Sequence, residues 1–203
     1  MKKYAVLHEP GDIVTLAGTR FVVLDVERRG SLPDSLFLLA LESVGASEFG
    51  SSNNYAESDL KKAVDKWLED MGKRGLDNAK LIPREIDLTT LDGSDCYGKL
   101  SVKAAPLTLD EAREYADIIP NAERWCWLAT GWSGPSKSDG DLALYVYSNG
   151  VWYSGVCSSS GGIRPALKAP SILFEDSEAG LDLSKIPTDD LLQEIHRRLA
   201  EKA

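Results

Sequence analysis

The chain has 203 residues, of which 43% are hydrophobic and 27% charged, and both fractions are ordinary for a globular protein with its own core. Its net charge of -9 argues against a nucleic-acid-binding protein, which needs a basic face to neutralise phosphates. No run reaches the roughly 18 consecutive apolar residues of a membrane span. The opening MKKYAVLHEPGD lacks the apolar segment of a secretory signal peptide, so we expect a cytoplasmic location and no membrane partner.

The first sixty residues predict strands. Two β-branched runs, residues 12–17 and 20–27, are separated by Gly18 and Thr19, and this arrangement indicates a hairpin. A third run, residues 35–42, is almost entirely apolar and predicts a strand that is buried on both faces.

Two helices are predicted in the middle of the chain. Ser58 is a suitable N-cap, the residues after it place apolar side chains on one helical face, and Gly72 is expected to end the helix. Thr108 and Glu111 have the T-x-x-E spacing of a capping box, which predicts the start of the second helix. Pro120 ends that helix at the latest.

Residues 141–148 and 151–156 predict two further strands joined by Asn149 and Gly150. An Asn-Gly pair is a strong hairpin signal, because a type I′ turn needs a positive φ at both central residues. Strands before and after two central helices make α+β the expected fold class.

A two-residue loop would place Tyr147 directly opposite Trp152, with Tyr145 on the same face, because side chains alternate along a strand. The opposite face would carry Leu144, Val146 and Tyr153 and is the better candidate for the core. The Tyr/Trp face has two interpretations. It is suited to a recognition surface, but cross-strand aromatic pairs also stabilise hairpins without any ligand.

The loops on either side of this hairpin, residues 131–141 and 157–162, are rich in small polar residues. Together with Tyr and Trp they have the composition of adaptable binding loops, although such loops are more often simply solvated. The candidate ligand-binding residues are Trp132, Ser136, Lys137, Ser138, Asp139, Tyr145, Tyr147, Trp152, Ser158, Ser159 and Ser160.

Residues after Lys168 change in composition. Residues 169–187 are interpreted as a linker that follows a domain of residues 1–168. A final amphipathic helix is expected over residues 188–203, with Thr188 as its N-cap. Residues 188–201 could dock on the domain itself or join copies of the chain in a homo-oligomer.

Familiar catalytic and metal-binding patterns are missing from the sequence. The two histidines, His8 and His196, lie near opposite ends, and no Cys/His spacing matches a zinc site. The three cysteines are odd in number and widely spaced, which favours free thiols. We therefore expect no enzyme, metal or cofactor, and oxidase-like chemistry at a Cys126–Cys157 pair is the alternative.

The segments RWCWLAT (124–130) and GGIRPAL (161–167) resemble a family of uncharacterised C-type-lectin-like domains from gut-type bacteria and their phages. The resemblance extends over about residues 10–168. It implies a C-type-lectin-like fold, a twisted and mostly antiparallel sheet flanked by two helices, with long loops and the last strands forming the binding face. Some relatives are the variable proteins of diversity-generating retroelements, which display randomised residues in this region.

Arg164 lies within the most specific part of this resemblance and has two interpretations. It could contact a ligand, but a structural role at the last strand is favoured, because a guanidinium can bond several loop carbonyls. The main hypothesis is a non-enzymatic domain that binds an unknown protein or small ligand. The alternative is a phage or bacterial assembly protein, which would be associated with the particle.

Overall fold

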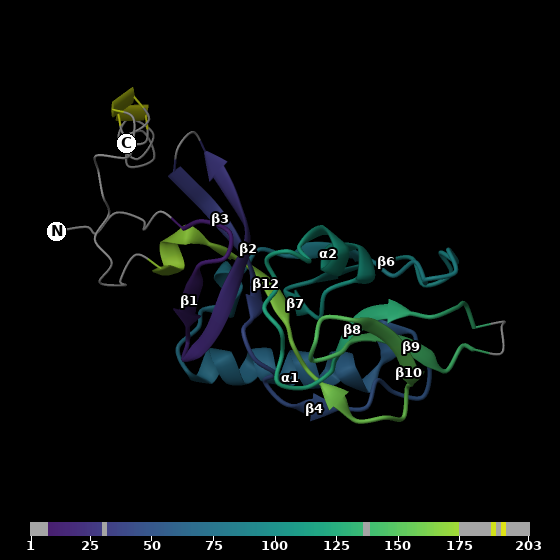
Figure 1. Cartoon of the computed structure of the whole chain (residues 1–203). Coiled ribbons are helices and arrows are strands. Elements are labelled where there is room, and N and C mark those ends of the chain that lie inside the picture. The colour runs from purple at the N-terminus through teal and green to yellow at the C-terminus, as the bar shows by residue number, and fades with distance from the viewer. Residues whose placement is uncertain (1–7, 30–31, 136–138, 175–187, 190–191, 194–203) are drawn as a thin grey trace.

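The computed structural model describes residues 8–29, 32–135, 139–174, 188–189 and 192–193 (Figure 1). Within them the chain is α+β, as predicted, with two five-stranded sheets, one two-stranded sheet and two α-helices. In the same part of the chain, every helix is too short or too polar to cross a membrane.

The first sheet joins the beginning and the end of the domain. Its strands, in spatial order, are β1 (Ile13–Leu16), β2 (Thr19–Arg29), β3 (Leu32–Ala40), β12 (Ala166–Pro170) and β7 (Ala104–Ala105), and all neighbours are antiparallel. The predicted β1–β2 hairpin is confirmed. Its turn residues are Ala17 and Gly18, with φ of 46° and 75°, one position earlier than expected.

The second sheet carries the predicted C-terminal hairpin. Its spatial order is β10 (Trp152–Val156), β9 (Leu142–Val146), β8 (Cys126–Gly131), β11 (Gly161–Gly162) and β4 (Ala46–Ser47). Only the β8–β11 pair is parallel among these described strands. A separate two-stranded sheet pairs β5 (Arg84–Asp87) with β6 (Lys99–Val102).

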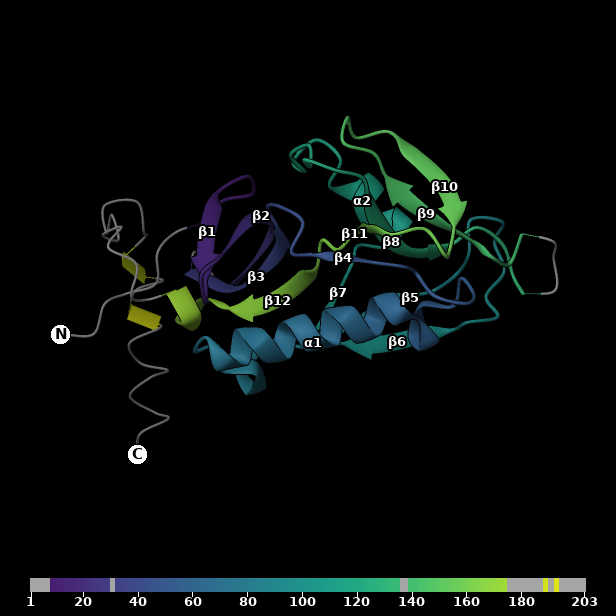
Figure 2. The same ribbon diagram turned by 90° about the horizontal axis from the view of Figure 1, so that it is seen from below.

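Both predicted helices are present and both predicted N-caps are confirmed. The Ser58 side chain accepts a hydrogen bond from the Lys61 amide at the start of α1 (Asp59–Lys73), and the Thr108–Glu111 capping box opens α2 (Leu109–Glu114). The α1 helix ends one residue after Gly72. It runs along the molecule and contacts β7 of the first sheet and β4 of the second (Figure 2).

Three short 3₁₀ helices complete the described elements: η1 (Tyr55–Glu57), η2 (Asn78–Lys80) and η3 (Ser171–Phe174). The folded domain therefore continues past Lys168, because β12 reaches Pro170 and the side chain of Phe174 is buried. The boundary expected at residue 168 is a few residues too early. The rest of the expected linker lies outside the described residues, and so does the final helix apart from residues 188–189 and 192–193.

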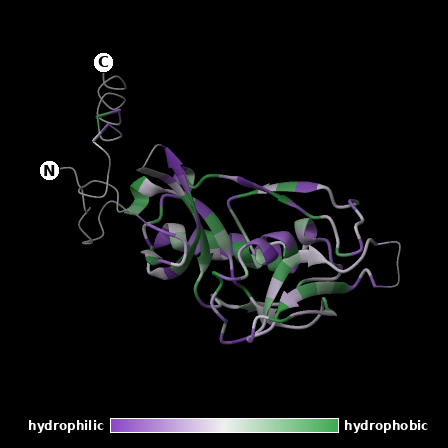
Figure 3. Ribbon diagram, turned by 45° about the horizontal axis from the view of Figure 1, so that its top comes forward, coloured by the Kyte–Doolittle hydropathy of each residue, from purple (hydrophilic) through white to green (hydrophobic). Residues whose placement is uncertain are grey.

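The core has two parts, one on each side of the first sheet. The cluster on the α1 side contains Phe21, Phe49, Leu38 and Trp127, and the cluster on the α2 side contains Leu39, Leu107, Leu128 and Leu144. The neighbours Leu38 and Leu39 point into different clusters, so β3 is buried on both faces, as predicted. Hydrophobic residues accordingly follow the strands, while the outer loops are mostly polar (Figure 3).

His8 links the two ends of the described domain. Its ring meets the ring of Phe174 edge-on at a centroid distance of 5.9 Å, and its side chain is nearly buried. Burial lowers the pKa of His8 below its usual value of 6.5, although the Asp12 carboxylate opposes this shift. The folded protein therefore favours the neutral imidazole.

The free energy of unfolding should fall as the pH drops through 6.5, because the unfolded chain takes up a proton at His8 that the folded chain resists. His8→Gln should lose less stability than the wild-type protein between about pH 7.5 and 5.5, by at most about 1.4 kcal/mol for each pH unit. Urea unfolding at several pH values measures this difference. Equal pH profiles for the two proteins would contradict the assignment.

Candidate functional site

The β9–β10 hairpin has a three-residue loop instead of the predicted two-residue loop. The Tyr147 amide donates to the Val151 carbonyl at 2.8 Å, and the Gly150 amide donates to the Tyr147 carbonyl at 2.9 Å. Gly150 has a φ of 83°, whereas Asn149 does not adopt a positive φ, so a type I′ turn is excluded. A turn followed by a left-handed glycine is the usual three-residue hairpin connection.

This loop shifts the strand register by one residue. Trp152 pairs with Val146, and Tyr153 pairs with Tyr145. The prediction that Tyr147 faces Trp152 is therefore wrong, because the extra loop residue moves every side chain of β10 to the other face. Tyr153 lies with Tyr145 and Tyr147, whereas Trp152 lies with Leu144 and Val146.

One face of the hairpin carries a continuous series of aromatic rings. Trp127 contacts Trp125 at a centroid distance of 4.9 Å, and Trp125 contacts Tyr145 at 4.8 Å. Tyr145 stacks on Tyr153 at 6.0 Å, and Tyr153 meets Tyr147 at 6.1 Å. Trp127 is 1% exposed, whereas the two outermost rings, Tyr153 and Tyr147, are 52% and 45% exposed. The inner rings hold the hairpin on the core, and only the outer ones are free to meet a partner.

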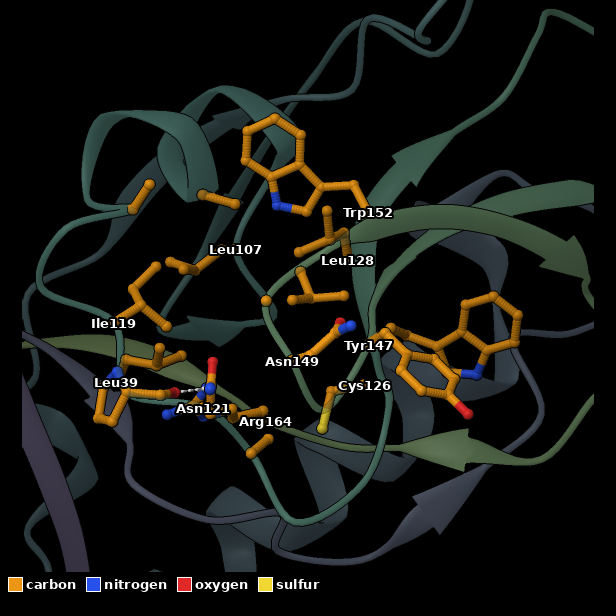
Figure 4. A pocket seen from close by; sticks show the side chains of 17 residues that line it. Leu39, Leu107, Ile119, Asn121, Cys126, Leu128, Tyr147, Asn149, Trp152 and Arg164 are labelled. Carbon is orange, nitrogen blue, oxygen red and sulfur yellow. Dashed lines mark hydrogen bonds between the residues drawn. The ribbon is translucent and has the colours of Figure 1, made fainter.

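The other face of the hairpin covers a pocket of about 230 Å³ (Figure 4). The remaining walls come from Leu39 of β3, from residues 107–122, which include α2, from β8 and from Arg164. Figure 4 shows the indole of Trp152 beside Leu107, whereas the ring of Tyr147 points away from the pocket. Most of the lining is apolar: Leu39, Leu107, Ala112, Ala116, Ile119, Leu128, Val146 and Trp152.

Two contacts join the hairpin to the opposite side of this pocket. The Arg113 guanidinium of α2 lies 5.5 Å from the centroid of the Trp152 ring, which is a cation–π distance. At the hairpin tip, a methyl group on Gly150 would lie 3.3 Å from the Asn121 side-chain oxygen. The hairpin therefore meets α2 at Trp152 and the 116–122 segment at its tip.

Arg164 forms the polar end of the pocket. Its Nε donates to the Ala40 carbonyl at 2.8 Å, its Nη1 to the Pro120 carbonyl at 3.0 Å and its Nη2 to the Leu41 carbonyl at 3.1 Å. Burial lowers the pKa of this guanidinium. These are the contacts of an arginine that ties a loop to a strand, which is the structural role favoured from the sequence.

The cysteines are all free, and Cys126 and Cys157 have separate surroundings. Cys126 lines the pocket next to Arg164, and burial raises the pKa of its thiol. Cys157 belongs to the core on the α1 side, where burial raises its thiol pKa to about 12. Neither thiol has the lowered pKa of a reactive cysteine. Among the described residues, no three His, Cys, Asp or Glu side chains gather as metal ligands.

The structure does not bring the predicted ligand-binding residues together. Trp132 and Asp139 precede β9, and Ser158, Ser159 and Ser160 follow β10, so these five lie at the opposite end of the hairpin from its tip. Tyr145 and Tyr147 occupy one face and Trp152 the other. Ser136, Lys137 and Ser138 lie outside the described residues. Among the described members of the set, Tyr147 and Trp152 line the pocket, and the ring of Tyr147 points away from it (Figure 4).

Sequence reasoning missed most of the pocket wall. Leu107, Ala112 and Ile119 lie around the capping box that predicted α2, yet nothing local indicates that this helix packs beneath the hairpin.

Comparisons of the chain with family models, with curated proteins and with solved structures give no match.

Proposed function

We propose that this protein is a non-enzymatic binding domain that holds a small ligand between its β9–β10 hairpin and α2. The observation that carries the proposal is the apolar pocket, with Trp152 at its rim and a few polar groups at one end. Concave, mostly apolar pockets with a few converging polar groups are the usual form of small-molecule sites. The volume of about 230 Å³ favours a ligand smaller than a typical drug.

The opposite face of the hairpin supports a second kind of recognition. Tyr147, Val151 and Tyr153 are each at least 45% exposed on this face, and β10 is an edge strand of its sheet. Exposed tyrosines are suited to protein contacts, because they combine apolar area with a hydrogen-bonding group. A protein partner would therefore meet this face, and the small ligand would occupy the pocket.

We further propose that the fold is C-type-lectin-like and that the hairpin region is diversified among relatives, as the GIRPAL resemblance implies. The mostly antiparallel sheets, the two helices and the pairing of β12 with β3 support the fold. Exposed positions on the hairpin, such as Tyr147 and Tyr153, could vary without loss of the core. Deep sequencing of codons 131–164 in a population of the source organism tests diversification, and an invariant stretch would exclude it.

Fragment binding separates the two faces of the hairpin. We expect small aromatic and aliphatic fragments to shift the amide resonances of Leu128, Val146 and Gly150 in the ¹⁵N-labelled protein, because these residues line the pocket. Trp152→Ala should weaken this binding about tenfold or more, since it removes a large apolar contact. Tyr153→Ala is the matched control and should leave binding unchanged, because its ring lies on the other face.

Ala116→Trp provides a second test of the same site. Ala116 lines the pocket but is exposed, so a larger ring should fill the space at little cost to the fold. Fragment shifts that vanish in this variant support the pocket. Shifts that persist, or that respond to Tyr153→Ala instead, would move the site to the aromatic face, and the absence of any shift would overturn the proposal.

A further inference from the structure

The Arg164 guanidinium is a buried positive charge at the end of an apolar pocket. The residue is 7% exposed, and none of the described carboxylates forms an ion pair with it. A buried charge is usually balanced by an opposite charge, because desolvation is otherwise costly. Carbonyl oxygens reduce this cost but carry only partial charge.

The hydrogen-bonding capacity of Arg164 is only partly used. A guanidinium has five N–H bonds, and three of them donate to the Ala40, Pro120 and Leu41 carbonyls. Two N–H bonds therefore remain, one on each terminal nitrogen. Since Arg164 lines the pocket, a group inside it can reach these donors.

Other polar groups surround the same end of the pocket. Asn121 and Asn149 line it from the 116–122 segment and from the hairpin tip, and Cys126 lies beside Arg164 (Figure 4). The Asn149 side-chain oxygen already accepts from the Val151 amide at 3.1 Å, which leaves its NH₂ group as a donor. The opposite end of the pocket is apolar, with Leu107, Ile119 and Trp152. The pocket therefore offers hydrogen-bond donors at one end and a hydrophobic surface at the other.

We propose that the ligand is a small monocarboxylic acid, with its carboxylate at Arg164 and its apolar body against Leu107, Ile119 and Trp152. This inference rests on the proposed function, because it assigns a chemical class to the ligand of the same pocket. A carboxylate supplies the missing negative charge and accepts the two remaining N–H bonds, and charge-assisted bonds of this kind are the strong ones. A primary amine of the same shape would place a second positive charge beside the guanidinium.

A series of matched probes tests this assignment on the wild-type protein. Hexanoate, hexanamide, hexanol and hexylamine share one apolar chain and differ in their head groups, as do 3-phenylpropanoate and its amide. We expect each acid to bind at least about tenfold more tightly than its amide or alcohol, and the amine to bind most weakly. Titrations followed through the Leu128 and Val146 amides measure the affinities. The Arg164 Nε resonance should shift with the acids alone.

Two arginine variants show which guanidinium binds the carboxylate of the ligand. Arg113→Gln removes the exposed guanidinium beside Trp152 and should leave the preference for the acid intact, whereas Arg164→Lys should reduce it about tenfold. If Arg164→Lys does not fold, the Arg164 Nε shift in the wild-type protein decides the question.

The possible failures of the two proposals differ. Equal affinity for acids and alcohols, or loss of the preference in Arg113→Gln, would overturn the carboxylate assignment while leaving the pocket as a ligand site. If none of these probes shifts the pocket resonances, the carboxylate assignment is also wrong. The fragment screen then decides whether the pocket binds ligands at all. Binding that persists in Ala116→Trp would place these ligands elsewhere and contradict both proposals.

Discussion

Arg84→Ala is expected to lower the free energy of unfolding by about 3–5 kcal/mol, because it breaks a buried ion pair from one side. The Arg84 side chain is 8% exposed, and its Nη1 pairs with the Glu111 carboxylate. Its Nη2 donates to the Ala105 carbonyl at 3.1 Å and to the Pro106 carbonyl at 3.2 Å. The guanidinium also lies 5.2 Å from the centroid of the Phe37 ring. The variant loses all of these contacts at once.

Arg84→Ala should also weaken the wall of the proposed ligand pocket, because Glu111 has a second role. Its carboxylate accepts a hydrogen bond from the Thr108 amide at 2.8 Å and so completes the capping box of α2. Without Arg84 this carboxylate remains partly buried and unpaired, which weakens the helix that forms one wall of the pocket. We therefore expect weaker binding of pocket ligands as well as lower stability.

Urea unfolding of Arg84→Ala, Glu111→Ala and the double variant measures the coupling. The double variant should lose less stability than the sum of the two single variants, because either change already breaks the pair. Lys99→Ala is the matched control, since Lys99 forms an exposed ion pair with Glu85 and its loss should destabilise the fold far less than the loss of Arg84. A cost for Arg84→Ala as small as that of the control would contradict the predicted role.

The helix starts could be predicted from the sequence because their signals are local. Ser58 and Thr108 each satisfy a backbone amide three residues later, so the pattern needs no information from the rest of the chain. The helix ends have weaker local signals. Gly72 was expected to end α1, but the helix closes after Lys73 and the left-handed glycine that follows is Gly75.

The hairpin was predicted correctly in place but not in register. Asn149-Gly150 fits two loops, a two-residue type I′ turn and a three-residue turn in which Gly150 alone has a positive φ. Only the second loop puts Tyr153 beside Tyr145, where it extends the aromatic series that begins at Trp127. The observed register therefore goes together with packing against Trp127 and Tyr145, and a local motif does not indicate this packing.

The pocket, too, could be predicted only in part from local sequence. The residue type of Trp152 makes it a candidate, but the pocket residues Leu107 and Ile119 flank α2, in a distant part of the chain. Strands of two residues, such as β7 and β11, are likewise too short to leave a periodic pattern. Long-range pairing decides these features, whereas the candidate residues were chosen from one continuous region.

Gly161→Ala is expected to be the most damaging substitution of a single glycine near the site. A methyl group at this position would lie 2.2 Å from the Trp125 ring and 2.6 Å from Nε1 of Trp127, far inside van der Waals contact. Trp127 cannot move freely, because it is 1% exposed and its Nε1 donates to the Ser47 carbonyl at 3.1 Å. Overpacking in a core usually costs about 1–3 kcal/mol. We expect about 3 kcal/mol or more here, because two rings are displaced together.

The rings that Gly161 accommodates are those on which the hairpin rests. Displacing Trp125 should disturb its contact with Tyr145, so the near-ultraviolet circular dichroism of the folded variant should change together with its unfolding midpoint in urea. Gly45→Ala is the matched control, because its added methyl would meet only the Ile163 side chain at an ordinary 3.8 Å. If both glycine variants unfold at the same urea concentration as the wild-type protein, the tryptophans do not need the space above Gly161. A selective loss of stability in Gly161→Ala, together with a changed near-ultraviolet spectrum, would show that Trp125 and Trp127 need this space in order to support Tyr145 of the hairpin.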